Sequence, residues 1–167
     1  MTVTAPPTDL SNGELVRWAF EAINRHDVSA LKQFWTAETL ERFPDRTCRG
    51  AEEIAAYFEE AFAAIADWRM EIVTVAEQGD DVFVRWHLTG THAGPLLGIE
   101  PTGKPLAVDG TDHFVIRDGR VVSNFVTFDQ MQYARQIGMM PPDGSAADKA
   151  VKRAFNARTK LAQRFRR

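Results

Sequence analysis

The chain has 167 residues, of which 44% are hydrophobic and 26% charged, and its formal net charge at pH 7 is -3. These values are typical of one folded globular domain, and they exclude a disordered or fibrous chain. A net negative charge gives no overall attraction to nucleic acid or to an anionic membrane, so we expect neither partner for the body of the chain.

Helical patterns dominate the first 66 residues. Ser11 followed by Glu14 matches a capping box, which predicts that the first helix begins there, after a flexible lead of residues 1–10. Apolar residues at three- and four-residue spacing continue this helix to Ile23 and predict two more helices, a short one over 29–35 and a long one over 51–66. Between them, the segment LERFPDRTCRG is expected to be a strand or loop around Phe43.

Four runs rich in valine and phenylalanine follow, over residues 69–76, 82–90, 106–116 and 121–128, and they predict β-strands. Asp118 and Gly119 between the last two runs form a strong hairpin signal. Asp129 then caps a short helix that ends at Ile137. Helices followed by antiparallel strands predict an α+β fold with the helices packed on one face of a curved sheet.

The domain is expected to span residues 11–142, and residues 143–167 form a basic helical extension. Lys149, Lys152 and Arg153 begin its series of basic residues, and Val151 and Phe155 begin an apolar ridge at helical spacing. Two hypotheses remain open for this extension. The ridge docks on the domain or on a second copy of the chain, or the extension binds nucleic acid or an anionic surface, which would depend steeply on salt.

Side chains alternate between the two faces of a strand, so parity predicts which residues share the interior. Asp112, Phe114 and Ile116 share one face of the third run, and this set is the more apolar. A carboxylate on an apolar face is a candidate general acid or base, because burial disfavours its charged form. Asp112 is therefore the catalytic candidate, with a structural role in capping a loop or pairing with an arginine as the alternative.

The same parity places further residues at an expected apolar pocket. Asn124 would orient a ligand or satisfy a backbone group, and Asn24 after the first helix has the same two interpretations. The helix aromatics would form either a ligand-stacking wall or ordinary core. Parity also turns Val122 toward the inside of the last strand. The predicted pocket residues are Asn24, Trp35, Tyr57, Phe62, Trp86, His92, Phe114, Asn124, Val126 and Phe128.

Of the histidines, His87 and His113 fall on the outward parity, and His92 in GTHAG lies near the expected pocket mouth or orders its loop. No metal site is expected, because the histidines lack matched carboxylates at ligand spacing, and no glycine-rich phosphate loop opens a helix. We therefore expect no cofactor. Cys48 is the single cysteine, and the start of the chain lacks a secretory pattern, so the sequence predicts a cytoplasmic protein without a disulfide.

Three segments in order, WHLTGTHAGPLLGIEPTGKPL, DHFVIRDGRVVSNF and DQMQYARQIG, resemble the SnoaL-like polyketide cyclases. This family lies within the nuclear-transport-factor-two-like superfamily, which includes ketosteroid isomerase. The resemblance implies a cone-shaped, mainly antiparallel sheet around the N-terminal helices, a pocket for a small hydrophobic organic ligand, and a homodimer.

At two positions the chain departs from the family pattern. The resemblance places the catalytic aspartate of the founding cyclases at Val126, which cannot carry a proton, and the pocket histidine of the family at Asp112. Two functions follow as alternatives. The chain is a cofactor-independent cyclase, isomerase or dehydratase that uses Asp112 on a polyketide- or terpenoid-like substrate, or it is a non-catalytic domain of the same fold that binds a hydrophobic ligand or a protein.

Overall fold

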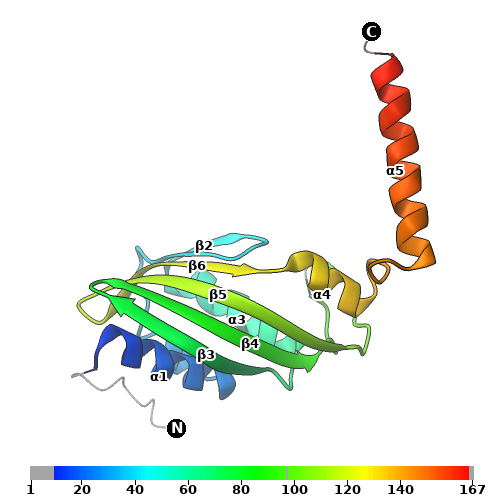
Figure 1. The fold of residues 1–167 in the computed structure, drawn as a ribbon. Coiled ribbons are helices and arrows are strands. Elements are labelled where there is room, and N and C mark those ends of the chain that lie inside the picture. Colours follow the sequence, from blue (N-terminus) through cyan, green and yellow to red (C-terminus); the bar gives the residue numbers. More distant parts are fainter. Residues whose placement is uncertain (1–9, 97, 166–167) are drawn as a thin grey trace.

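A computed structural model describes residues 10–96 and 98–165, which form a six-stranded curved sheet and five helices (Figure 1). The α+β prediction is therefore confirmed. The strand order is β2-β1-β6-β5-β4-β3, and every neighbouring pair is antiparallel except β1 and β6. Residues 1–9 of the predicted lead lie outside the described residues. The elements are α1 (Asn12–Asn24), α2 (Val28–Leu31), β1 (Leu40–Arg42), β2 (Thr47–Arg49), α3 (Gly50–Ala64), β3 (Arg69–Gln78), β4 (Asp81–Thr91), β5 (Pro105–Arg117), β6 (Arg120–Phe128), α4 (Gln130–Ile137) and α5 (Ala146–Arg164).

Helices α1 and α3 cover one face of the sheet, here called the inner face, while the opposite face is left open (Figure 1). The capping box at α1 is complete, since the Ser11 backbone N–H donates to Glu14 Oε2 at 2.8 Å and the Glu14 N–H donates to Ser11 Oγ at 3.2 Å. The Gly13 N–H donates to Glu77 Oε2 on β3 at 2.8 Å. The start of α1 is thus attached directly to the edge strand of the sheet.

The segment between α2 and α3 differs most from its sequence pattern. Helix α2 ends at Leu31, yet Phe34 and Trp35 remain buried in the turn that follows it. Residues 40–49 form a small hairpin of β1 and β2, and β1 pairs in parallel with β6. The Thr39 hydroxyl donates to the carbonyl of Val121 at 2.6 Å and fixes the start of β1 against β6.

A β-bulge corrects the predicted parity of β6. The register moves from Val115 opposite Ser123 to Ile116 opposite Val121, so Val122 is an extra residue on the bulged strand. Val121 is buried at 2% exposure, whereas Val122 is 40% exposed on the open face. The prediction that Val122 faces the pocket is therefore wrong, because strict alternation fails at the bulge.

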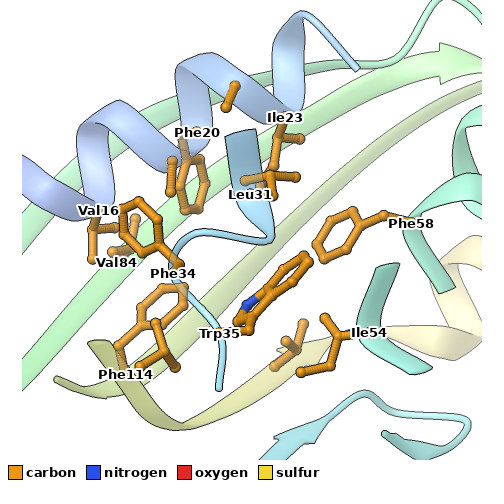
Figure 2. Close-up of a cluster of buried hydrophobic side chains, with 14 of the residues drawn as sticks. Val16, Phe20, Ile23, Leu31, Phe34, Trp35, Ile54, Phe58, Val84 and Phe114 are labelled. Atoms are coloured by element: carbon orange, nitrogen blue, oxygen red, sulfur yellow. The ribbon is translucent and has the colours of Figure 1, made fainter. Parts of the chain in front are cut away.

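The largest hydrophobic cluster lies between the helices and the inner face of the sheet. Figure 2 shows that this cluster gathers Phe20 and Ile23 of α1, Trp35 of the turn after α2, Phe58 of α3 and Phe114 of β5. A second, smaller cluster, here called the distal cluster, lies beside α4. Its buried members are Ala64, Ile65, Leu106, Val108, Tyr133 and Ile137, and Trp68, Leu96, Ile99 and Phe128 pack against it.

Helix α5 extends away from the sheet (Figure 1). Asp148 is its buried residue, and its carboxylate accepts from the Gly144 N–H at 3.1 Å and from Lys152 Nζ at 2.7 Å. The ridge residues Val151 and Phe155 are exposed. Within the described ranges, none of the helices is both long enough and apolar enough to span a membrane.

Candidate functional site

The inner face of the sheet and the helices enclose a cavity of about 110 Å³. Apolar and aromatic side chains from α1, α3 and strands β3 to β6 form most of its wall. Three carboxyl groups, those of Glu41, Asp45 and Asp112, and the amide of Asn124 also line it. An apolar pocket with a few placed polar groups is the usual form of a small-molecule site.

Asp112 lies on β5 with its side chain on the inner face, at 7% exposure. The Trp86 indole N–H donates to Asp112 Oδ1 at 2.9 Å. Gly110 pairs with Trp86 across β4 and β5, and a Cβ at position 110 would collide with the indole ring. A residue without a side chain is therefore needed opposite Trp86, because the ring occupies that space when it donates to Asp112.

Glu41 lies on β1 and is the buried carboxyl group that sequence analysis missed, with 2% exposure. The Trp35 indole N–H donates to Glu41 Oε1 at 2.7 Å. The sequence held one signal for the inward direction of Glu41. Glu41 and Phe43 are two residues apart in a segment expected to be a strand or loop, and in a strand this spacing puts both side chains on one face. A strand of three residues is too short for that alternation to stand out.

Asn124 on β6 lies between the two carboxyl groups. It is the register partner of Glu41 across the parallel β1–β6 pair, and its Nδ2 is 3.5 Å from both Glu41 Oε2 and Asp112 Oδ2. These two oxygens are therefore at most 7 Å apart. Asn124 Oδ1 is buried without a partner among the described residues. Below, Glu41 and Asp112 are called the carboxyl pair, and Asn124 is called its bridge.

Burial raises the pKa of Asp112 to about 7, and the hydrogen bonds from Trp86 and Asn124 oppose this rise. Burial, followed by the negative charge of Asp112, raises the pKa of Glu41 to about 8, against the opposing hydrogen bonds from Asn124 and Trp35. Once one of the two groups has lost its proton, its negative charge disfavours ionisation of the other. Near neutral pH the cavity can hold one proton acceptor and one proton donor together.

Most of the predicted pocket residues do line the cavity. They are Trp35, Tyr57, Trp86, Phe114, Asn124, Val126 and Phe128, together with the catalytic candidate Asp112. Tyr57 stacks on Phe43 with ring centroids 3.6 Å apart, and its hydroxyl is 3.4 Å from Asp45 Oδ1. Burial raises the pKa of Tyr57, so its hydroxyl stays protonated.

The other three, Asn24, Phe62 and His92, are not among the side chains that line the cavity. The Asn24 amide donates to the Met70 carbonyl at 2.8 Å and accepts from the Met70 N–H at 2.7 Å, which joins α1 to β3. Phe62 stacks on His26. His92 is fully buried, and its Nδ1 is 3.1 Å from Thr102 Oγ1 within the loop after β4. These contacts place Asn24, Phe62 and His92 in the framework around the cavity.

The remaining titratable groups of the sheet lie outside the cavity. His113 Nε2 is 2.6 Å from Asp81 Oδ1, and His87 Nδ1 is 3.2 Å from Asp109 Oδ1, both on the open face. In the part of the chain that the structure describes, no three His, Cys, Asp or Glu side chains are grouped as metal ligands would be. Asp129 caps α4 by accepting from the Met131 and Gln132 N–H groups.

The sequence pattern of the family described as SnoaL-like polyketide cyclase matches residues 13–137. No curated protein gives a match. Among solved structures, a protein from Jannaschia sp. CCS1 assigned as a SnoaL-like polyketide cyclase is 24% identical, with a TM-score of 0.71 over 81% of this chain and 100% of that one. TsrD from Streptomyces laurentii is 25% identical, with a TM-score of 0.69 over 79% of this chain and 100% of that one. TerC, co-crystallised with polyporic acid, is 17% identical, with a TM-score of 0.62 over 74% of this chain and 95% of that one.

Proposed function

The chain belongs to the SnoaL-like polyketide cyclase family, and from this premise we propose that it is a cofactor-independent enzyme that transfers protons within a small hydrophobic, polyketide- or terpenoid-like substrate. The observation that carries the proposal is the carboxyl pair, Glu41 and Asp112, bridged by Asn124 inside an apolar cavity. Cyclisation, isomerisation and dehydration are the reactions that such a pair can support.

The proposed first step is the same for each reaction. The Asp112 carboxylate takes a proton from a carbon next to a carbonyl group, and protonated Glu41 gives its proton to the carbonyl oxygen as negative charge develops there. The product is a neutral enol, with the proton now on Asp112 and the charge on Glu41. The substrate then decides whether the enol carbon attacks a second carbonyl, accepts a proton elsewhere or expels a hydroxyl group.

The surrounding donors support these roles. Trp86 and Trp35 each donate to one oxygen of a carboxyl group, at 2.9 and 2.7 Å, so each group is held in one orientation. The apolar walls keep both pKa values close to neutral pH, where proton transfer in either direction is most effective.

A non-catalytic ligand-binding domain is the second candidate. It is favoured by the observation that both carboxyl groups already receive an indole hydrogen bond, as in a satisfied structural network. In that case the cavity binds a hydrophobic compound and leaves it unchanged.

Proton exchange into a bound ligand distinguishes the two candidates without knowledge of the final product. Panels of ketosteroids, epoxides and polyketide mimics in D₂O are followed by NMR for exchange at carbons next to carbonyls and for conversion. We expect Asp112→Asn and Glu41→Gln to lower exchange by about 10²- to 10⁴-fold while ligand binding is retained. Asp109→Asn is the matched control, because Asp109 lies on the same strand and faces away from the cavity. Binding by the parent protein with no exchange or conversion would favour the non-catalytic domain.

We also propose that the protein acts as a homodimer in the cytoplasm. Phe83 of β4 and Phe125 of β6 are both register partners of His113 on β5, and they expose 52% and 49% of their surface. An exposed apolar patch on a sheet is a candidate interface between protein copies. Sedimentation of the parent protein and of Phe83→Glu tests this, and a monomeric parent would contradict it.

A further inference from the structure

Helix α5 has an apolar face that no described part of the chain covers. A helix turns about 100° per residue, so residues three, four and seven positions apart share a face. On this face Val151, Phe155 and Leu161 each expose more than half of their surface. Alanines lie between and beside them, namely Ala147, Ala150, Ala154 and Ala162. Together these residues form the apolar ridge of α5.

The opposite face of α5 is basic. Its residues follow the same helical spacing and include no acid: Lys149, Lys152, Arg153, Asn156, Lys160, Gln163 and Arg164. Arg158 lies within the ridge, where its long side chain can cover apolar surface and still place its charge at the boundary. Asp148 in the first turn is the single acidic residue of the helix. The whole chain has a net charge of -3, so α5 is a positive segment of an acidic chain.

Most of these positive charges have no partner within the molecule. Lys152 contacts Asp143 at 3.2 Å and Asp148 at 2.7 Å. Among the described residues, no other basic side chain of α5 is paired with a carboxylate. The charge of α5 is therefore complementary to an anionic partner from outside the chain.

Of the anionic partners, a lipid bilayer matches both faces of the helix. A nucleic acid would supply phosphates to the basic face and leave the apolar ridge in water. A second α5 would cover the ridge, but the two helices carry like charges that repel each other. In an anionic bilayer the ridge enters the boundary of the acyl chains, while lysine and arginine side chains reach the headgroups.

The position of α5 fits this partner. The helix extends away from the sheet (Figure 1), and the Asp148 carboxylate connects its first turn to Arg135 of α4 at 3.6 Å. An anionic membrane repels the acidic remainder of the chain. A basic helix that extends from the domain lets the helix bind while the domain stays in water. Its 19 residues would lie along roughly 28 Å of the membrane surface.

We propose that α5 binds in the plane of an anionic phospholipid bilayer, with its apolar ridge in the acyl boundary and its basic face among the lipid phosphates. The helix thereby brings the cavity of the domain to a membrane surface. The proposal concerns α5 alone and does not rest on the proposed function.

Flotation of the full chain with two kinds of vesicle tests the charge requirement. One kind mixes phosphatidylglycerol with phosphatidylcholine, and the other is phosphatidylcholine alone. We expect binding to the first that weakens as salt is added, and little binding to the second. Lys160→Gln should weaken binding to the anionic vesicles by about fivefold, the effect of one charge near such a surface. Arg120→Gln, at the far end of β6 from α4, is the control and should bind as the parent does.

Val151→Asn tests the ridge. We expect it to weaken binding to the anionic vesicles by about 3- to 10-fold, because a polar side chain enters the acyl boundary less readily than valine. Val73→Asn makes the same change at a valine of β3 with similar exposure, and it should leave binding unchanged. Equal losses in the two variants would overturn the proposal, as would equal binding of the parent to both kinds of vesicle or binding to neither.

Two further measurements identify the other possible partners. Titration with a mixed-sequence DNA duplex would overturn the proposal if binding were as tight as to the anionic vesicles and unchanged in Val151→Asn. Sedimentation would assign the ridge to a second copy if the parent self-associates and Val151→Asn does not, and that result would overturn it as well. Both substitutions in α5 replace exposed side chains, so unchanged circular dichroism should confirm that the variants are folded. None of these readouts uses turnover, so membrane binding and the proposed catalysis can fail separately.

Discussion

Asp112 and Val126 are direct partners across the antiparallel pair of β5 and β6, and both side chains line the cavity. The family resemblance places the acid of the founding cyclases at Val126 and a histidine at Asp112. In this chain the ionisable group is therefore on the neighbouring strand, beside the position where the resemblance expects it. The cavity keeps a carboxyl group in that region, now accompanied by Glu41 from β1.

The free energy of unfolding should decrease as the pH rises from about 5 to about 8.5. The unfolded chain loses its carboxyl protons near pH 4, whereas folded Asp112 and Glu41 keep theirs until about 7 and about 8. The folded state therefore binds more protons in this range, and raising the pH favours the unfolded state, by up to several kcal/mol at about 1.4 kcal/mol per unit of pKa shift. Urea unfolding of the parent and of Asp112→Asn/Glu41→Gln would show the difference, and parallel pH curves would contradict it.

Replacing Trp86 by Phe should raise the pKa of Asp112 further. The Trp86 N–H stabilises the ionised carboxylate, and its loss corresponds to about one pKa unit if the hydrogen bond is worth ~1.5 kcal/mol. A ¹³C NMR titration of the Asp112 carboxyl carbon measures this directly. Trp35→Phe is the matched control, because it removes the donor to Glu41 instead. An unchanged or lowered Asp112 pKa in Trp86→Phe would refute the assignment.

A methyl group at position 110 should displace the Trp86 ring. The added Cβ of Gly110→Ala overlaps the indole, so we expect a loss of about 1–3 kcal/mol in stability and of the Trp86–Asp112 hydrogen bond. The indole N–H resonance of Trp86 in a ¹⁵N spectrum reports the bond. Thr111→Ala, at the next residue on the exposed face, should leave that resonance in place. If the Trp86 resonance is also unchanged in Gly110→Ala, the hydrogen bond to Asp112 does not depend on the close approach of the Trp86 ring to Gly110.

Asp148 should determine the direction of α5. Its carboxylate accepts from Gly144 and Lys152 and lies 3.6 Å from the Arg135 guanidinium of α4. We expect Asp148→Ala to increase hydrogen exchange over residues 144–152 without changing the stability of the sheet. The exposed Asp143, which contacts the same two basic side chains, provides the control Asp143→Ala with a smaller effect. Lys152 lowers the pKa of Asp148, so this joint should persist near neutral pH and weaken as acid protonates the carboxylate.

Much of the fold could be predicted because its signals are local. The cap at Ser11, the helical spacing in α1 and α3 and the alternation in β4 and β5 each depend on residues a few positions apart. The inward direction of Asp112 followed from the same alternation. Turn chemistry at Asp118 and Gly119 likewise needs only two residues, both of which have positive φ.

The missed parts depend on contacts between distant segments. Val122 faces outward because a bulge forms only when β5 and β6 pair, and no single-strand pattern records it. Glu41 joins Asp112 because β1 pairs with β6, and three residues are too few to reveal that partner.

The sequence by itself determined the kinds of elements, their order, the family and one inward-facing acid. The tertiary structure alone decided that a second acid lies near the first and that Asn124 lies between them. The physical reason is that backbone periodicity sets the face of each side chain within its own element. Strand order, register and burial are set by the packing of the whole chain, and these determine which groups meet and how their pKa values shift.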